Sequence, residues 1–455
     1  MNTLRFIVFI LFFYFPKAQY ASEAMHIVEH EMGYGARSLS MGGAFTALGD
    51  GPSGMYWNPA GLADIKNGSV YFESYNMYHN NNTSYLGESQ ANPFDISRVN
   101  GLGAVLPIPT IRGSLVFGIG FNRIHHYDAL MSFSGYSNFK NGLEFPIFAD
   151  GELFYYTFER GVQRYEKIMS NGARDQLTFS FGIALSPNLA GGMSISRMNG
   201  LENYDFEFLQ SDIADNFQEF PADFQSYELF QSLKTKTNAW KIRGGLKYIY
   251  SPFQFGLSIA LPYNVNVDEV HATQERLIFD NAFKEDTIEV ARYDYKVKMP
   301  STIDFGAALV TDFNFSLSVG FRIQDWSQMQ FDLIDFVVGS DEYNSLNEEN
   351  RIINEEYTIV SQLRFGGEYL VPLSENFGVS ARFGSAFIPS PKLSDARDTR
   401  ISSFGLGIPI QKRIMLDIAY LYTYHKKTSN DSYAPSDVIE EIHKSQILFN
   451  LSYLF

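Results

Sequence analysis

Few side chains in this 455-residue chain have the spacing that enzyme or metal chemistry requires. His26 and His30 would share one face of a helix, but no third metal ligand accompanies them. His125 and His126 are adjacent, so their side chains would point apart on a strand. The chain has no cysteine, which excludes disulfides, thiolate zinc sites and cysteine nucleophiles. Nucleotide and nucleophile motifs are also missing, so we expect a protein that is not an enzyme and uses no cofactor.

Charged side chains recur at alternate positions in otherwise apolar stretches. These positions are Lys241, Arg243, Lys247, Arg322, Arg364, Glu368, Arg382 and Asp417. In a largely dry interior an Arg or Lys could pair with the carboxylate of a ligand. Arg322, Arg364 and Arg382 are the candidate ligand cations, and an ion network that only braces the structure is the alternative.

Aromatic side chains crowd two polar stretches, 125–173 and 199–234. The second stretch carries Phe206, Phe208, Phe217, Phe220 and Phe224. The last three have i, i+3, i+7 spacing, which would give a helix one apolar face. Such side chains either pack against one another or bind an apolar ligand. We take all five as candidate ligand-binding residues, with mutual packing as the alternative.

The net charge is −16, from 51 acidic and 35 basic residues, so we expect no nucleic-acid partner. Residues 325–359 are an acidic stretch that would be solvated, bind Ca²⁺, or bridge to lipopolysaccharide through divalent cations. Aromatic residues make up 16% of the chain, although its mean hydropathy is only −0.14.

The N-terminus has the pattern of an export signal. Arg5 precedes an apolar run over residues 6–15, and Ala18 or Ala24 is a suitable cleavage site. We therefore expect a signal peptide at 1–18. No later stretch approaches the length of apolar sequence that a membrane-spanning helix needs.

Most of the remaining chain alternates apolar and polar or small residues with a period of two. The stretches 177–185, 253–263, 313–324 and 414–424 show this pattern, which places the apolar side chains on one side of a strand. Many strands run for about 11 residues, the length that a tilted membrane strand needs. Aromatic residues near the strand ends are expected to form an interfacial girdle; they are Trp240, Tyr248, Tyr250, Tyr263, Tyr420, Tyr422 and Tyr424.

Short and long connections alternate along the chain. Short turns fall at 107–113, 186–188, 250–252, 311–313, 371–376 and 409–413. Long polar stretches fall at 78–99, 125–173, 199–234, 265–288, 325–359, 388–400 and 425–442. We place the first strand at 69–77, the last strand at 443–455 and a kink at Pro300 inside 289–311. The order of connections then predicts an all-β, antiparallel transmembrane barrel of about 14 strands over 69–455. The terminal Phe455 looks like the signal for the barrel-assembly machinery.

Residues 25–68 do not alternate and are rich in Gly and Ala. Small residues allow close packing in a confined space. We expect the segment 19–68 to be a hatch inside the barrel, with a periplasmic extension as the alternative.

Two groups of residues resemble the FadL/TodX family of outer-membrane transporters for long-chain fatty acids and aromatic hydrocarbons. The first lies in the predicted hatch and includes Gly35, Arg37, Gly42, Gly43, Asn58, Pro59 and Ala60. The second, over 364–369, 382–384, 399–407 and 417–420, resembles the family's last strands. The family has a barrel with an N-terminal hatch, whereas residues 125–290 show only general barrel character.

The resemblance implies passive uptake of hydrophobic small molecules across the bacterial outer membrane, by loop capture, hatch-gated passage and lateral release. Outer-membrane lipid and lipopolysaccharide would surround the barrel. Gly118 and Gly120 are candidates for the wall interruption that lateral release needs. A PorV-type shuttle or scaffold protein of a secretion system, which shares the hatch, is the alternative, and a general aqueous pore is a third reading.

Overall fold

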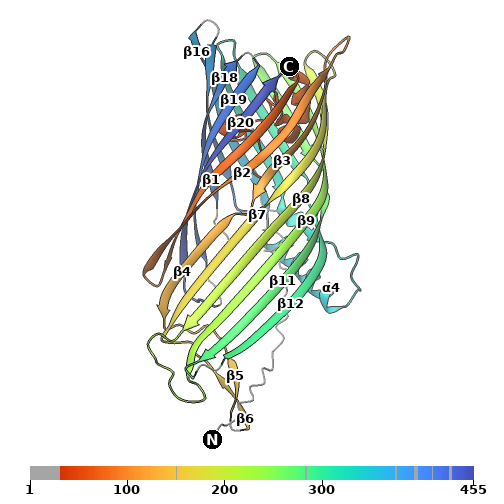
Figure 1. The fold of residues 1–455 in the computed structure, drawn as a ribbon. Helices are drawn as coiled ribbons and strands as arrows, with labels where there is room; N and C mark the ends of the chain where they lie inside the picture. Colours follow the sequence, from red (N-terminus) through yellow and green to blue (C-terminus); the bar gives the residue numbers. More distant parts are fainter. Residues whose placement is uncertain are drawn as a thin grey trace.

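The computed structural model describes residues 31–149, 151–281, 284–374, 377–393, 398–411, 413–429 and 433–455. It is a closed antiparallel β-barrel of fourteen strands, as predicted (Figure 1). The signal peptide expected at 1–18, together with His26 and His30, lies outside the described residues. No helix among the described residues is long and apolar enough to cross a membrane.

The wall contains eighteen strand elements. They are β1 (Ser69–Tyr85), β2 (Glu88–Ile108), β3 (Leu115–His126), β4 (Ala129–Ser137), β7 (Val162–Ala184), β8 (Leu189–Ser211), β9 (Phe224–Tyr250), β10 (Phe253–Ala260), β11 (Tyr263–Phe279), β12 (Lys284–Met299), β13 (Thr302–Val310), β14 (Phe315–Asp325), β15 (Gln330–Phe331), β16 (Ile359–Ser374), β17 (Phe377–Ile388), β18 (Thr399–Gln411), β19 (Ile414–Ser429) and β20 (Val438–Leu454). Four strand positions consist of two successive elements: β3 with β4, β10 with β11, β12 with β13, and β14 with β15.

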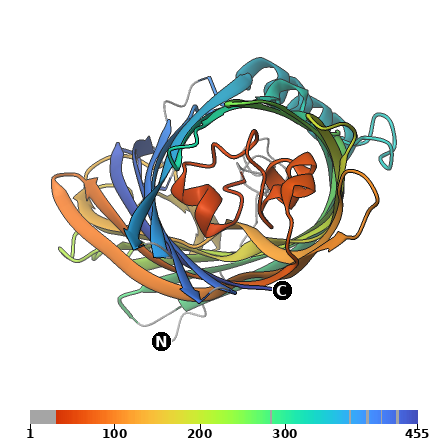
Figure 2. The same ribbon diagram turned by 90° about the horizontal axis from the view of Figure 1, so that it is seen from above.

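The ring closes between the first and last strands, where Ser69 pairs with Leu454. The kink predicted at Pro300 is confirmed, because β12 ends at Met299 and β13 begins at Thr302 in the same strand position. Figure 2, which looks down the barrel, shows the described N-terminal residues inside the ring. They contain three short helices: α2 (Ala36–Ser40), α3 (Gly54–Trp57) and the 3-10 helix η1 (Pro59–Asp64).

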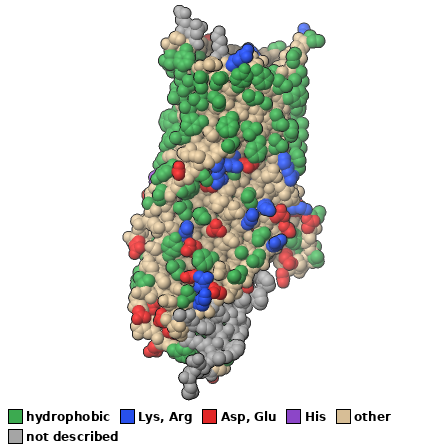
Figure 3. Space-filling model, viewed as in Figure 1, with side chains coloured by type: hydrophobic (Ala, Val, Ile, Leu, Met, Phe, Trp, Pro, Cys, Tyr) green, Lys and Arg blue, Asp and Glu red, His purple; other side chains and the backbone are tan. Residues whose placement is uncertain are grey.

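Outward-pointing apolar side chains form a band at the short-turn end of the barrel, which is the upper half of Figure 3. Every strand contributes an exposed large side chain; one from each is Phe72, Leu102, Phe117, Phe179, Ile195, Leu246, Phe255, Phe305, Phe321, Phe365, Phe383, Phe404, Tyr420 and Phe449. The alternate residues on these strands point inward, so the period of two in the sequence separates lipid-facing from lumen-facing side chains.

The predicted aromatic girdle is wrong for Tyr263, whereas five of its other members are exposed on the outer wall. Trp240, Tyr248 and Tyr250 are exposed on β9. Tyr263 instead faces the lumen, where its ring lies 5.4 Å from the Lys241 Nζ. The break between β10 and β11 shifts the alternation, so that Leu261 points outward and Tyr263 inward.

Most of the long polar stretches that we predicted as loops are strand extensions. Residues 78–99 form the far ends of β1 and β2. Beyond the lipid the outer face of a strand meets water, so the pattern of apolar residues is lost while backbone pairing continues. Residues 125–173 also hold the small hairpin of β5 (Phe145–Ala149) and β6 (Glu152–Tyr156). Residues 325–359 hold η2 (Trp326–Gln328) and α4 (Asp341–Glu356).

Candidate functional site

Residues 31–68, which we call the lumenal segment, lie against the inner wall at the short-turn end (Figure 2). Glycines permit the closest contacts. Gly42 has a φ of +65°, and a Cβ at this position would lie 2.6 Å from the carbonyl oxygen of Ser385 on β17. Only glycine adopts this conformation without strain and has no side chain to collide with the wall. Close packing against the wall therefore explains why glycine occurs here.

Asn58 uses both ends of its amide, one within the lumenal segment and the other to reach the wall as well. Its Oδ1 accepts from the backbone N–H of Ala60 at 3.1 Å, which caps η1 at Pro59. Its Nδ2 donates to the carbonyl oxygens of Thr46 at 2.8 Å and of Leu246 on β9 at 3.0 Å. The Asn-Pro-Ala element therefore ends one turn of the segment and fixes it to the barrel.

Serine hydroxyls on the wall donate hydrogen bonds to backbone carbonyl oxygens of the short helices. Ser194 of β8 donates to the oxygen of Met55 at 2.7 Å, and Ser403 of β18 donates to the oxygen of Ser40 at 3.0 Å. Buried carbonyls without a partner are costly, so these small polar lumen residues stabilise the segment inside the barrel.

The inward-pointing charges that the sequence singled out are almost all paired with one another or with the lumenal segment. Arg37 of α2 pairs with Asp50 at 3.0 Å and with Glu368 at 2.9 Å. Arg382 pairs with the same Glu368 at 2.5 Å and with Asp417 at 2.6 Å. This part of the network braces the segment against β16, β17 and β19. For Arg382 the structure therefore shows the bracing ion network that we named as the alternative to ligand binding.

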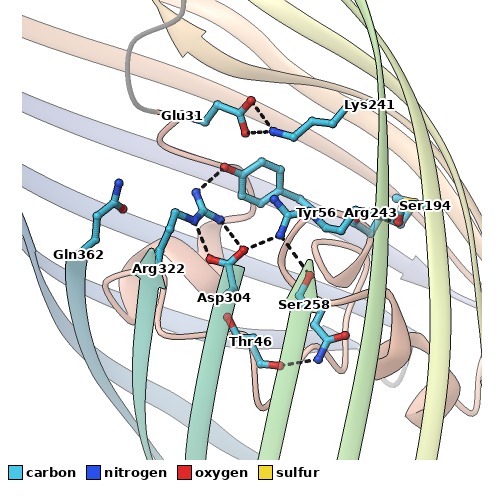
Figure 4. Close-up of polar contacts among 12 residues, drawn as sticks. Glu31, Thr46, Tyr56, Ser194, Lys241, Arg243, Ser258, Asp304, Arg322 and Gln362 are labelled. Atoms are coloured by element: carbon cyan, nitrogen blue, oxygen red, sulfur yellow. Dashed lines mark hydrogen bonds and ion pairs between the residues drawn. The ribbon is translucent and has the colours of Figure 1, made fainter. Parts of the chain in front are cut away.

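A second group of charges surrounds Tyr56 of the lumenal segment (Figure 4). Asp304 accepts from Arg322 Nε and from Arg243 Nη1, each at 2.6 Å. Arg322 also donates to the Tyr56 hydroxyl at 3.0 Å, and Arg243 donates to Ser258 at 3.1 Å. Arg322 is therefore held by a carboxylate and a hydroxyl that both belong to the chain.

Arg364 lies deeper, beneath the lumenal segment. Its guanidinium lies 5.0 Å from the centre of the Trp57 ring, and its Nη2 donates to Gln362 at 2.7 Å. Within the described part of the chain it has no carboxylate partner, and its Nε has no hydrogen-bond acceptor. A Cβ at Gly43 would collide with Arg364 Nη1, so the segment packs directly on this side chain.

Glu31, at the start of the lumenal segment, pairs with Lys241 of β9 (Figure 4). The Lys241 Nζ donates to both carboxylate oxygens, at 2.7 and 2.8 Å, and the two side chains are 7% and 9% exposed. Burial raises the pKa of Glu31, but the positive charges of Lys241 and Arg174 outweigh it and hold that pKa well below its usual range. A cavity of about 20 Å³, room for about one water molecule, lies beside this pair and is also lined by Arg243, Arg322 and Gln362.

On the short-turn side of the segment the lumen is open. A cavity of about 960 Å³ is lined by charged residues of the segment and by turn residues such as Thr110 and Thr311. The cavity beside Glu31 is much smaller, at about 20 Å³.

The aromatic candidates at the long-loop end pack against one another. Phe158 stacks on Phe224 at 4.2 Å between ring centres, and Phe217 meets both rings edge-on. Phe206, Phe208 and Phe224 are buried in this cluster, which we call the aromatic cap. Residues 212–223 contain turns, not the expected helix, and Phe220 is exposed. For Phe206, Phe208, Phe217 and Phe224, the structure thus shows the mutual packing that we named as the alternative to ligand binding.

Within the described residues, the wall has a seam between β2 and β3. Pairing between β2 and β3 runs from Ile108–Leu115 to Gly101–Asn122 and then ends, and β4 pairs with β7. Beyond Gly101 the described residues of β2 pair only with β1. Arg98 of β2 spans the seam, donating to Asp128 at 2.7 Å and to the carbonyl oxygen of Gly172 at 3.2 Å.

The interruption that we expected at Gly118 and Gly120 is not there. β3 continues through both glycines, and a Cβ at either would collide with Met55 or Tyr71. They make room for inner side chains, and the strand breaks at residues 127–128 instead. No local sequence signal marks that position.

The histidines and the acidic stretch show no metal site. Among the described residues no group of three or more His, Asp or Glu side chains could hold a metal ion. His126 lies at the end of β3, where its ring stacks on Tyr75 at 4.0 Å between centres. The long connection that we predicted over 125–173 is therefore wrong at its start, because His125 and His126 belong to β3.

The sequence matches no family model and no curated protein. Solved structures do match. The P. putida toluene transporter TodX is 14% identical with a TM-score of 0.58, over 94% of this chain and 99% of that one. A Pseudomonas aeruginosa FadL homologue is 12% identical with a TM-score of 0.58, over the same shares. The Ralstonia pickettii toluene transporter TbuX is 15% identical with a TM-score of 0.53, over 93% and 99%. These likenesses establish a common fold.

A bilayer admits β-structure only as a closed barrel, and an outward apolar band is the mark of outer-membrane barrels. The protein is accordingly a multi-pass β-barrel of the bacterial outer membrane. Its lumen is filled by a segment held through glycines, serines and ion pairs, and its wall has a seam beside the start of that segment.

Proposed function

We propose that this protein takes up hydrophobic small molecules, long-chain fatty acids among them, by passive passage through the barrel. The observation that carries the proposal is the seam between β2 and β3. Exposed Val99 and Leu102 on β2 and Phe121 on β3 flank it on the outside. On the inside, the backbone N–H of Met32 donates to the carbonyl oxygen of Ile124 at 3.1 Å. The seam thus lies between the lumenal segment on the inside and exposed apolar side chains on the outside.

This arrangement suits an apolar cargo. Apolar molecules partition poorly into a water-filled pore, and the charged lipopolysaccharide surface slows their entry into the bilayer. A molecule that enters through the aromatic cap and leaves sideways through the seam never crosses the packed lumenal segment. The segment would act as a hatch that shapes the route. Two of the solved structures named above are described as toluene transporters, which supports the same general chemistry here.

Uptake by cells tests the proposal. The protein is expressed in a host that lacks its own hydrophobic-uptake channel, and the entry of labelled oleate, toluene and a sugar is measured. We expect faster entry of oleate or toluene than in cells with an empty vector, with no change for the sugar. Equal entry of all three solutes with and without the protein, at normal surface expression, would refute the proposal. Faster sugar entry and salt conductance in planar bilayers would favour an aqueous pore.

A further inference from the structure

One long strand of the wall has a free edge at the long-loop end. β12 pairs with β11 along its whole length. On its other side it pairs only with the two residues of β15, at Val297 and Lys298. Just beyond them, the backbone N–H of Asp332 donates to the carbonyl oxygen of Lys296 at 2.8 Å. Over residues 284–295 no described residue pairs with this second side of β12, which lies in the lower half of Figure 1, outside the apolar band.

The bond to Lys296 identifies the backbone groups that point to the free side. The N–H and C=O of one strand residue point to the same side, and this side alternates along the strand. Because the register of β12 against β11 has no shift, every second residue before Lys296 directs both groups away from β11. These residues are Asp286, Ile288, Val290, Arg292 and Asp294. A row of unpaired N–H and C=O groups is a template for another strand.

The middle of this edge is apolar. Ile288 is 68% exposed and Val290 is 62% exposed. Proteins commonly protect a free edge with charges, proline or a bulge, whereas these two positions carry none of them. Ile288 also lines a groove of about 410 Å³ with Met169, Phe230 and Ala272. The apolar surface at the edge therefore continues onto the neighbouring strands.

Charges beside the apolar pair determine what a partner strand must carry. Asp294 lies directly opposite Asp268 of β11, and like charges in this position repel each other. A cation on an added strand, opposite Asp294, would relieve this repulsion. Arg292 is exposed and has no carboxylate partner among the described residues. An anion opposite Arg292 and apolar side chains opposite Val290 and Ile288 complete the complementary pattern.

We propose that the free edge of β12 is a docking site for an extended segment of another polypeptide, which adds as an antiparallel strand on the cell-surface side of the membrane. Backbone hydrogen bonds supply the affinity, and the side chains that meet the apolar pair, Arg292 and Asp294 supply the specificity. A second copy of this chain does not fit. Antiparallel pairing of β12 with itself needs a two-fold axis perpendicular to the wall, which would invert the second barrel in the membrane.

A synthetic peptide tests the inference on the purified full chain in amphipol. It carries Lys opposite Asp294, Glu opposite Arg292 and Ile opposite Val290 and Ile288, with Thr between these positions. Its dissociation constant is compared with that of the same peptide N-methylated at the amides that face β12. N-methylation keeps every side chain but removes the donors, so binding should weaken by about tenfold or more. Equal binding of the two peptides, or no binding of either, would overturn the inference.

Val290→Pro makes the matching change in the protein. The Val290 N–H points to the free side, so proline removes a donor to the partner and leaves the pairing with β11 intact. The variant should keep the wild-type melting temperature and bind the peptide about tenfold more weakly. Val290→Thr keeps the N–H and should bind the peptide as the wild type does. Wild-type affinity in a folded Val290→Pro would show that the edge is not used; if this variant misfolds, the N-methylated peptide still decides.

Charge reversal tests the register. Arg292→Glu should weaken binding of the peptide several-fold, and a peptide with Lys in place of its Glu should restore it. Arg112→Glu, an exposed site in a short turn at the opposite end of the barrel, is the matched control and should change neither constant. If the reversed peptide does not restore binding to Arg292→Glu, the assigned register is wrong and the partner described here is refuted.

Discussion

The backbone N–H of Met32 donates to the carbonyl oxygen of Ile124 at 3.1 Å, so the lumenal segment covers a place along β3 that β2 has left. A free strand edge in a membrane barrel is costly, because its backbone groups have no water to bond with. The chain therefore closes its own seam from within, by this hydrogen bond and by Arg98.

Arg98→Gln should loosen the seam. The substitution leaves the buried carboxylate of Asp128 without its arginine and removes one of the two donors to the carbonyl oxygen of Gly172. A loss of about 1.4 kcal/mol of local closure corresponds to about tenfold faster amide hydrogen exchange over residues 123–128. Arg276→Gln removes an exposed arginine from the outer face of β11 and serves as the control. Unchanged exchange in Arg98→Gln would mean that Arg98 does not hold the seam.

Two neighbouring glycines on β9 give a matched test of the contact between segment and wall. A Cβ on Gly245 would collide with Asn58 Oδ1, whereas a Cβ on Gly244 would meet no atom within 4 Å. Gly245→Ala should lower the free energy of unfolding by about 1–3 kcal/mol, as overpacking does. Gly244→Ala should leave it unchanged, as followed by thermal unfolding. Equal melting temperatures for the two variants would contradict the tight fit described for Asn58.

Asp304→Asn should be strongly destabilising. Asp304 is the carboxylate shared by Arg243 and Arg322, and all three side chains are buried. Removing one partner of a buried ion group leaves uncompensated charge and costs about 3–5 kcal/mol. Asp335→Asn breaks an exposed pair with Lys296 and should not change the melting temperature. A melting temperature of Asp304→Asn equal to that of the wild type would show that this charge group does not stabilise the barrel.

The aromatic cap can be tested by contrasting two phenylalanines four residues apart. Phe224 is 0% exposed and stacks on Phe158, whereas Phe220 is 52% exposed. Phe224→Ser should weaken the cap by about 3–5 kcal/mol and expose residues 212–223 to added protease. Phe220→Ser should be cut no faster than the wild type. Faster cutting of Phe220→Ser would instead give Phe220 a place in the packed cap.

The alternation of residue types determined much of the fold. Because side chains on a strand alternate between faces, stretches such as 313–324 and 414–424 predict which side faces lipid without any knowledge of neighbouring strands. The order of short and long connections predicted fourteen strands, and the Gly/Ala composition of 25–68 predicted tight packing. Where a strand leaves the lipid this signal fades, so residues 78–99 looked like a loop although they are paired.

Only the tertiary structure decided which charges are available and where the wall breaks. Lys241 and Glu31 are 210 residues apart, and Arg37 and Glu368 are 331 apart. Periodicity indicates which face a residue occupies but not which residue lies opposite it, so it could not identify the carboxylates that pair with Lys241, Arg322 and Arg382. The seam likewise forms because β2 and β3 stop pairing beyond Gly101. Pairing between strands is a long-range feature, so the sequence of neither strand alone predicts where it ends.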